Sequence, residues 1–175
     1  MRWARLFVTG LEKIVSNAHP MICYLVTAKL DLLAKLRLFL QKKFINPEEL
    51  PDWKDFFTQV VTVENHGVKT IYISGQVGVD KQQKLVGTGD FAAQTKQALL
   101  NLATALAGAS TTFADVVKIN LYVVNYKYED AAVIGELLRQ HFPAEKLPAC
   151  SLIGVQALAR KEFLIEIEAT AVSES

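Results

Sequence analysis

A few short segments of the sequence carry side chains that could do chemistry on a small molecule. Cys150 stands in "PACS", at the start of an apolar run that predicts a buried strand. Glu166 and Glu168 alternate with isoleucine in "IEIE", so both carboxylates lie on one face of a strand. Ser74 precedes Gly75, and a glycine lets a ligand approach the backbone closely. These residue types suit a nucleophilic thiol or a carboxylate that activates water.

The role of Cys150 stays open at this level: catalytic nucleophile, thiol lining a ligand site, or core packing. A nucleophilic thiol needs a nearby base and a lowered pKa. The histidines fall in the N-terminal segment, in a turn and at the end of a helix, and none is an evident partner: His19, His66 and His141. The two cysteines, Cys23 and Cys150, lack a spacing such as C-x-x-C, and we predict neither a metal nor a cofactor.

The charge distribution divides the chain in two. Residues 1–44 carry eight bases and two acids, a net charge of +6, whereas the rest carries 11 bases and 16 acids, a net charge of −5. We therefore assign 1–44 to an N-terminal extension and 45–175 to one domain, whose length and 51% hydrophobic content over the whole chain suit a packed core.

The extension contains an apolar run that is interrupted by four charged residues, Lys29, Asp31, Lys35 and Arg37. These charges disfavour a membrane-spanning helix. A basic, acid-poor segment also fits an organelle transit peptide or an amphipathic helix on a membrane surface. We favour a third alternative, a poorly packed extension that is present because the translation start is assigned too far upstream.

The remaining residues predict an α/β domain. Val-, Ile- and Thr-rich runs at about 59–63 and 70–74 flank "NHG", which indicates a hairpin. Helical spacing follows in "DFAAQTKQALLNLATALAGA", with Asp90 as the N-cap and Gly108 where the helix stops. A second helix lies in "YEDAAVIGELLRQHF", which Pro143 closes.

Three further strands complete the pattern. The first alternates apolar residues at Val117, Ile119, Leu121 and Val123. The others, "ACSLIGVQAL" and "FLIEIEATAV", are joined by the charged turn "ARKE", whose Arg160 and Lys161 we expect in solvent. One sheet with both helices on the same face is the simplest layered solution. Its open face carries Glu166 and Glu168 among apolar residues, which favours an oligomer contact or a site there.

The domain resembles the Rid family (reactive intermediate deaminases, YjgF-like, also labelled endoribonuclease L-PSP). The segments that carry the resemblance are "ISGQVGVD" at 73–80, "GDFAAQTKQALLNL" at 89–102, "DVVKINLYV" at 115–123 and "PACSLIGVQALARKEFLIEIEA" at 148–169. The resemblance implies a chorismate-mutase-like α/β fold, a single mixed sheet with two helices on one face. It also implies a homotrimer with small-molecule clefts between subunits.

Members of this family that hydrolyse 2-iminopropanoate and related enamines use an arginine that grips the substrate carboxylate, a glutamate that activates water, and backbone groups near S-G-Q. By this resemblance Glu166 is the catalytic glutamate, and Ser74 and Gly75 bind the ligand. The arginine position, directly after Pro-Ala, is Cys150 here, and the family's aromatic position is Phe57, which lacks a hydroxyl.

We include Cys150, its neighbour Ser151 and Phe57 among the ligand-binding residues. A thiol cannot replace two charge-assisted hydrogen bonds, worth about 1.5–3 kcal/mol each. We therefore expect an imine or enamine hydrolase with a non-standard substrate. The alternative is a non-catalytic metabolite-binding or scaffold homotrimer.

The partners predicted for residues 45–175 are a small molecule and further copies of the chain. A net charge of −5 and the lack of a stacking aromatic pair argue against a nucleic-acid partner. No membrane contact is expected for this domain. With two cysteines a disulfide framework is not expected, and this favours a reducing, cytoplasmic setting.

Overall fold

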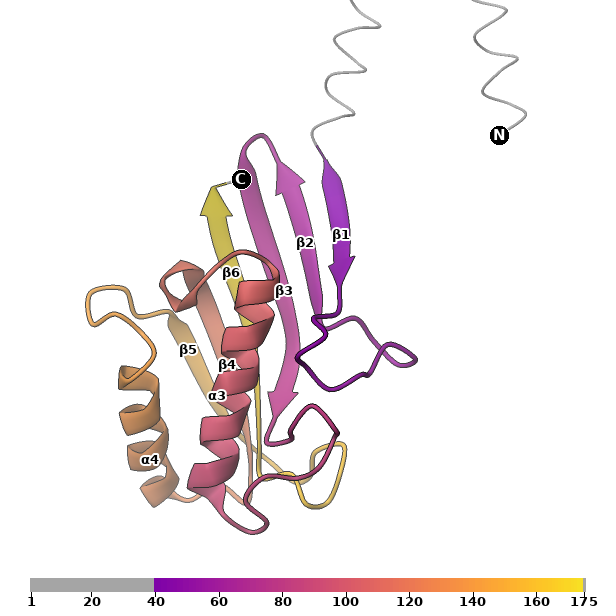
Figure 1. Ribbon diagram of the computed structural model, residues 1–175. Coiled ribbons are helices and arrows are strands. Elements are labelled where there is room, and N and C mark those ends of the chain that lie inside the picture. Colours follow the sequence, from indigo (N-terminus) through magenta and orange to yellow (C-terminus); the bar gives the residue numbers. More distant parts are fainter. Residues whose placement is uncertain (1–39, 175) are drawn as a thin grey trace, which may run out of the picture. The chain divides into compact units, whose positions relative to one another are not determined.

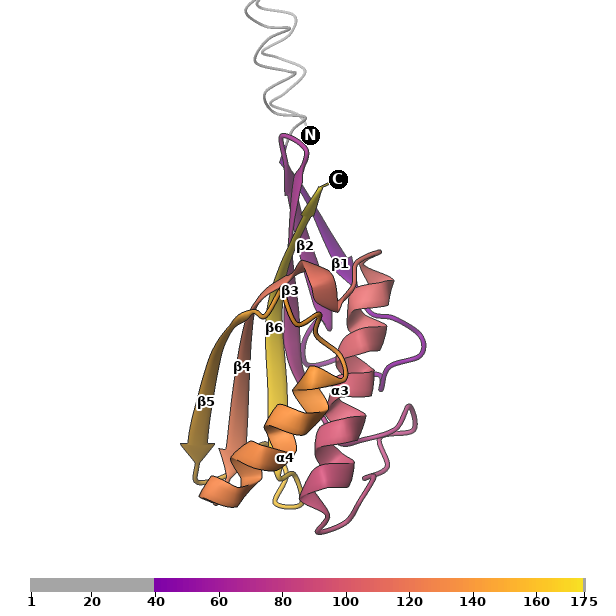
Figure 2. The same ribbon diagram turned by 90° about the vertical axis from the view of Figure 1, so that its left-hand side faces the viewer.

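The computed structural model describes residues 40–174; the expectations for residues 1–39 lie outside this range. Its elements are β1 (Gln41–Ile45), β2 (Val60–Asn65), β3 (Val68–Val77), α3 (Phe91–Gly108), the 3-10 turn η1 (Phe113–Asp115), β4 (Val116–Val124), α4 (Tyr128–Arg139), β5 (Ala149–Val155) and β6 (Ile165–Glu174). The strands form one mixed sheet in the order β1-β2-β3-β6-β4-β5 (Figure 1). Both helices cover the same face, as predicted (Figure 2).

Strands β2 and β3 form the predicted hairpin, with longer arms than the sequence indicated. The turn residues His66 and Gly67 both have positive φ, 50° and 81°. This backbone twist matches that of the flanking strands, which is why such turns favour short hairpins.

Strand β1 was not foreseen. It pairs antiparallel with β2, from Gln41 opposite Glu64 to Ile45 opposite Val60, and the compact unit that contains the sheet begins at Gln41. The sheet therefore begins inside the segment that the charge distribution assigned to the extension. These residues are mostly exposed, so their composition does not resemble that of a core strand.

In the described range, no helix is both long enough and apolar enough to cross a membrane.

Helix α3 begins as expected, because the Asp90 carboxylate accepts a hydrogen bond of 2.9 Å from the Ala93 amide. Its buried apolar side chains pack on the inner face of the sheet; they are Ala98, Leu99, Leu102, Ala105 and Leu106. The buried residue of α4 is Ile134, which joins the same core.

Two details of the last strands differ from expectation. β5 and β6 are not a hairpin: β4 lies between them, parallel to β5 and antiparallel to β6. "ARKE" is therefore part of a longer connection and not a tight turn. In addition, Val117 does not share the buried face with Ile119, because the register shifts after Val116 and leaves Val117 47% exposed.

Candidate functional site

The Ser-Gly pair singled out in the sequence is a β-bulge. Regular pairing of β3 with β6 stops at Ile73 and resumes at Gln76, so Ser74 and Gly75 together oppose one residue of β6. The Ser74 amide donates a hydrogen bond of 3.0 Å to the Gln59 carbonyl, just before β2, and its hydroxyl donates one of 2.7 Å to the Thr58 carbonyl. The bulge turns the backbone at Gly75 out of the regular ladder.

The carboxyl group of Glu166 packs directly against this bulge. A Cβ atom at position 75 would overlap the Oε1 atom of Glu166, so only glycine leaves room for the carboxyl group. Glu166 is half-buried on the face that lacks helices, as its alternation with Ile165 and Ile167 predicts.

The surroundings of Glu166 favour its protonated form. Burial raises the pKa of this carboxyl group, and the nearby charge of Glu168 raises it further. No described residue donates a hydrogen bond to it. Glu168 differs, since its Oε1 atom accepts hydrogen bonds from Asn120 at 2.7 Å and Tyr122 at 3.0 Å. Glu166 is therefore the carboxyl group that is available to exchange a proton with a ligand.

A cavity of about 660 Å³ lies beside Glu166. It is formed by the β1–β2 loop, the end of β3, the loop after β3, the β5–β6 loop and β6. The residues that line it are Trp53, Phe56, Phe57, Gly75, Val77, Gln83, Ala159, Arg160, Phe163 and Glu166. Its walls are mostly aromatic and apolar, with a few polar groups, which is typical of a small-molecule site.

Arg160 is exposed, as expected from the sequence, and it also lines this cavity. Its guanidinium carbon lies 5.1 Å from the centre of the Trp53 ring and 5.6 Å from that of Phe163. Sequence reasoning missed Trp53, and it considered Arg160 as a replacement cation but favoured a position in solvent. The two are far apart along the chain, and no local pattern indicates that their loops meet.

Cys150 lies on the other face of the sheet. Its partner in the parallel ladder is Ile119, which is fully buried under the helices, and the thiol lines a separate cavity of about 250 Å³. Arg139 of α4 lines the same cavity, together with apolar side chains. Burial raises the pKa of the Cys150 thiol, and the positive charge of Lys118 lowers it by less than burial raises it. No histidine lines this cavity, so a nucleophilic thiolate is not favoured.

Ser151 faces the open side of the sheet, next to Cys150 but pointing oppositely. Its hydroxyl accepts a hydrogen bond of 2.6 Å from the Lys118 ammonium group. Within one chain the structure thus brings Glu166, Gly75 and Phe57 to one cavity, whereas Ser74, the neighbour of Gly75 in the bulge, is not among its lining residues. It leaves Cys150 and Ser151 away from that cavity.

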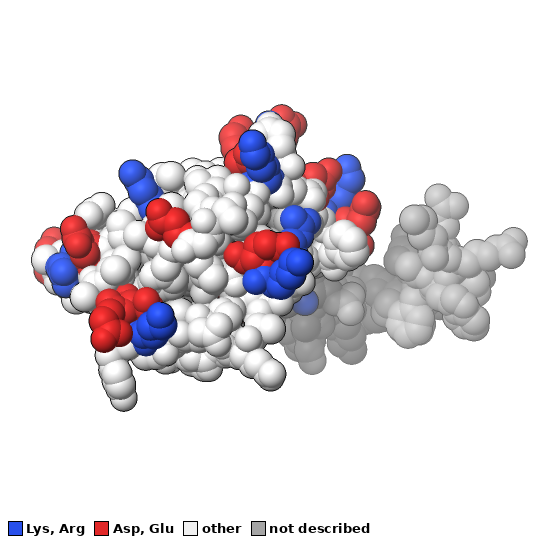
Figure 3. Space-filling model, turned by 90° about the horizontal axis from the view of Figure 1, so that it is seen from below, with Lys and Arg blue, Asp and Glu red and all other residues white. Residues whose placement is uncertain are grey.

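The surface at the loop end of the sheet carries charges of both signs. Figure 3 shows this end, with acidic and basic side chains interspersed and no continuous basic patch on the visible face. Among residues 40–174, no group of His, Cys, Asp and Glu side chains has the arrangement of a metal site.

Several curated relatives are named 2-iminobutanoate/2-iminopropanoate deaminase. A 2-iminobutanoate/2-iminopropanoate deaminase of Rattus norvegicus is 34% identical over 131 residues, which cover 75% of this chain and 90% of the relative. The deaminase of the same name from Homo sapiens is 33% identical over 131 residues, with the same coverage of 75% and 90%.

Solved structures share the fold. RidA from the Antarctic bacterium Psychrobacter sp. is 31% identical, with a TM-score of 0.63 and coverage of 74% of this chain and 98% of that one. A putative endoribonuclease from Thermotoga maritima is 28% identical, with a TM-score of 0.67 and coverage of 77% and 100%. The family model described as Endoribonuclease L-PSP matches residues 52–173. With this sheet, this bulge and these relatives, the chain belongs to the Rid (YjgF-like) family.

Proposed function

We propose that this protein hydrolyses the C=N bond of small imines, and of enamines after tautomerisation, in the cavity beside Glu166. The observation that carries this proposal is the half-buried Glu166 carboxyl group, packed on the glycine of a β-bulge at the wall of a 660 Å³ cavity. The names of the relatives, which are deaminases of 2-iminobutanoate and 2-iminopropanoate, support the reaction type.

The proposed reaction needs one water and one proton-transfer group. The ionised Glu166 takes a proton from water while the water oxygen forms a bond to the imine carbon. As the C=N electron pair moves to nitrogen, the nitrogen takes that proton back from Glu166, which gives a neutral amino alcohol. Glu166 then moves the hydroxyl proton of the amino alcohol to nitrogen, the C–N bond breaks as the C=O bond forms, and a carbonyl compound and ammonia leave. No electron is transferred. A raised pKa suits Glu166 to both steps, because it strengthens the base while leaving the acid able to give the proton back.

A homotrimer with ligand sites between subunits is part of the proposal. The open face of the sheet exposes large apolar side chains that a contact with another copy would bury: Phe44, Tyr72, Ile153 and Val172. Because Cys150 and Glu166 are on opposite faces, they can contact one ligand only if two chains contribute to the site. The trimer implied by the family resemblance has such clefts.

The substrate in this proposal is not anchored by residue 150. A neutral thiol makes no bidentate bond to a carboxylate. Phe57 likewise offers no hydroxyl to a ligand. These two differences favour the second candidate, a non-catalytic homotrimer that binds a metabolite. A cytoplasmic setting is also proposed; it rests on the cysteine content of the sequence alone.

A coupled assay tests the activity. An amino-acid oxidase generates imines from several amino acids, and an amine oxidase generates imines without a carboxylate; the disappearance of each imine is followed with and without the protein. We expect acceleration of at least one imine, reduced about 100-fold or more in Glu166→Gln. Glu174→Gln, an exposed acid on the same strand, is the matched control and retains the wild-type rate. No acceleration of any imine would favour the binding protein.

A further inference from the structure

We propose that Arg160 binds the carboxylate of the ligand in the cavity beside Glu166, so that the protein selects anionic imines with large apolar side chains. This inference rests on the proposed function and adds the substrate class. The carboxylate anchor would come from the β5–β6 loop of the chain that supplies Glu166, and not from position 150.

The guanidinium group of Arg160 is oriented but not neutralised. The rings of Trp53 and Phe163 lie at 5.1 and 5.6 Å from it, and one nitrogen donates a long hydrogen bond of 3.4 Å to the Gln83 carbonyl. Arg160 forms no ion pair with any described residue. Since a guanidinium group has five N–H donors, most remain available for a carboxylate.

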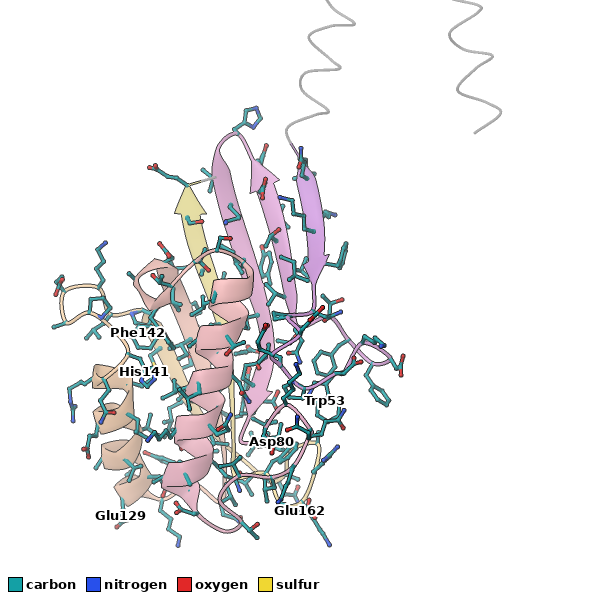
Figure 4. All side chains as sticks on the ribbon, in the orientation of Figure 1. Trp53, Asp80, Glu129, His141, Phe142 and Glu162 are labelled. Atoms are coloured by element: carbon teal, nitrogen blue, oxygen red, sulfur yellow. The ribbon has the colours of Figure 1, made fainter. Side chains whose placement is uncertain are left out.

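The loop that carries Arg160 is attached to the core. Gln94 of α3 is fully buried. Its side-chain amide nitrogen donates a hydrogen bond of 3.0 Å to the Glu162 carbonyl, and its side-chain oxygen accepts one of 2.9 Å from the Leu164 backbone amide. Phe163 between them is 4% exposed. Figure 4 shows Glu162 and Trp53 on loops at the same end of the sheet. The backbone that carries Arg160 is therefore held in place close to the cavity, which helps to position its side chain for a ligand.

Arg160 and Glu166 line one cavity without pairing. An arginine in contact with Glu166 would lower the pKa of that carboxyl group. Its pKa is instead raised, by burial and by Glu168. A ligand can therefore place a carboxylate at Arg160 and its C=N group at Glu166. The aromatic wall from the β1–β2 loop, Phe56 and Phe57, then suits an apolar side chain larger than a methyl group.

Arg139 provides a matched control. It is also an exposed arginine that lines a cavity, the one that contains Cys150, on the opposite face of the sheet. If Arg139 is the anchor instead, the site depends on the helix face and this inference is wrong.

The kinetic test compares two imines that share an isobutyl side chain, one from leucine with its carboxylate and one from 3-methylbutylamine without it. We expect Arg160→Gln to raise KM for the leucine imine about 10- to 100-fold with little change in kcat, and to leave the second imine unaffected. Arg160→Lys should fall between, because it keeps the charge but loses the planar fork. Arg139→Gln should change neither. Equal losses for both imines in Arg160→Gln, or the KM effect in Arg139→Gln, would overturn the inference.

A binding test separates this inference from the proposed function. Titration calorimetry measures the affinity of the full chain for 4-methyl-2-oxopentanoate, a carboxylate of the same shape that needs no turnover. Weakening of about 10-fold or more in Arg160→Gln, and none in Arg139→Gln, supports the anchor even if no imine is hydrolysed. Imine hydrolysis and binding that both persist unchanged in Arg160→Gln would leave the proposed function standing and reject the anchor.

Discussion

The Tyr122 hydroxyl donates a hydrogen bond of 3.0 Å to Oε1 of Glu168. Asn120 donates to the same oxygen at 2.7 Å, so the carboxylate of Glu168 is tied to the neighbouring strand. The bond and the charge of Glu168 raise the pKa of Tyr122. Two residues away along β6, Glu166 has no such donors and lines a cavity. The carboxylate of Glu168 is thus held by side chains of the neighbouring strand, and its negative charge raises the pKa of Glu166.

Replacing Glu168 by Gln should shift the pH profile of imine hydrolysis. Removal of this charge lowers the pKa of Glu166, so Glu166 stays ionised to lower pH and the acidic limb of kcat/KM moves to lower pH. The measurement is kcat/KM against pH for the variant and for Glu174→Gln, which should keep the wild-type limb. An acidic limb that does not move would show that Glu166 is not the titrating base.

Replacing Glu166 by Gln should stabilise the fold at neutral pH. Because the folded-state pKa of Glu166 is raised, its contribution to stability is present below the unfolded-state pKa and is lost as pH rises through the folded-state pKa. The variant removes this loss. We expect a melting temperature higher than wild type by roughly 1–3 °C at pH 8 and equal at pH 3.5, a modest change because the group is only half-buried. Thermal melts at the two pH values check this; a lower melting temperature at pH 8 contradicts it.

Gly75→Ala should reduce activity without unfolding the protein. The added methyl group would occupy the position of the Glu166 carboxyl group and force it to rotate away. We expect a loss of roughly 100-fold in kcat/KM, as for a misplaced catalytic group. The control is Gly135→Ala, where the new Cβ would meet only Arg139 at an ordinary 3.5 Å. Equal activity in both variants would mean that the position of Glu166 is unimportant.

Cys150→Arg should increase turnover of 2-iminopropanoate, the small anionic substrate class of the relatives, about 10-fold or more. The added guanidinium group supplies two charge-assisted hydrogen bonds from the chain opposite Glu166 in the proposed trimer. Cys150→Lys is the matched variant, with the same charge but no planar fork, and should gain less. Initial rates with alanine-derived imine give the comparison. If neither variant gains, position 150 does not face the ligand.

Tyr72→Lys should weaken the proposed trimer. Tyr72 is 51% exposed in the middle of the open sheet face, opposite Thr170 of β6, and a lysine there would bury a charge in each subunit contact. Leu100→Lys is the control, since Leu100 is 46% exposed on α3, which covers the other face. Analytical ultracentrifugation should find wild type and control trimeric and the Tyr72 variant shifted toward monomer. A monomeric wild type would reject the trimer.

The sequence alone was sufficient for the elements whose cause is local. The positive-φ turn at His66 and Gly67 and the Asp90 cap follow from residue type at a fixed spacing. The face shared by Glu166 and Glu168 follows from the two-residue period of a strand. The family, too, was recognisable from short segments whose order and spacing survive in the chain.

The tertiary structure decided what depends on partners distant in sequence. Gln41–Ile45 is a strand because β2 offers an edge, and β5 is separated from β6 because β4 lies between them. That arrangement brings Arg160 and Trp53 to the cavity of Glu166 and keeps Cys150 on the opposite face. The physical reason is that a strand's residue period fixes which side chains share a face, whereas long-range pairing and burial fix which faces and loops meet.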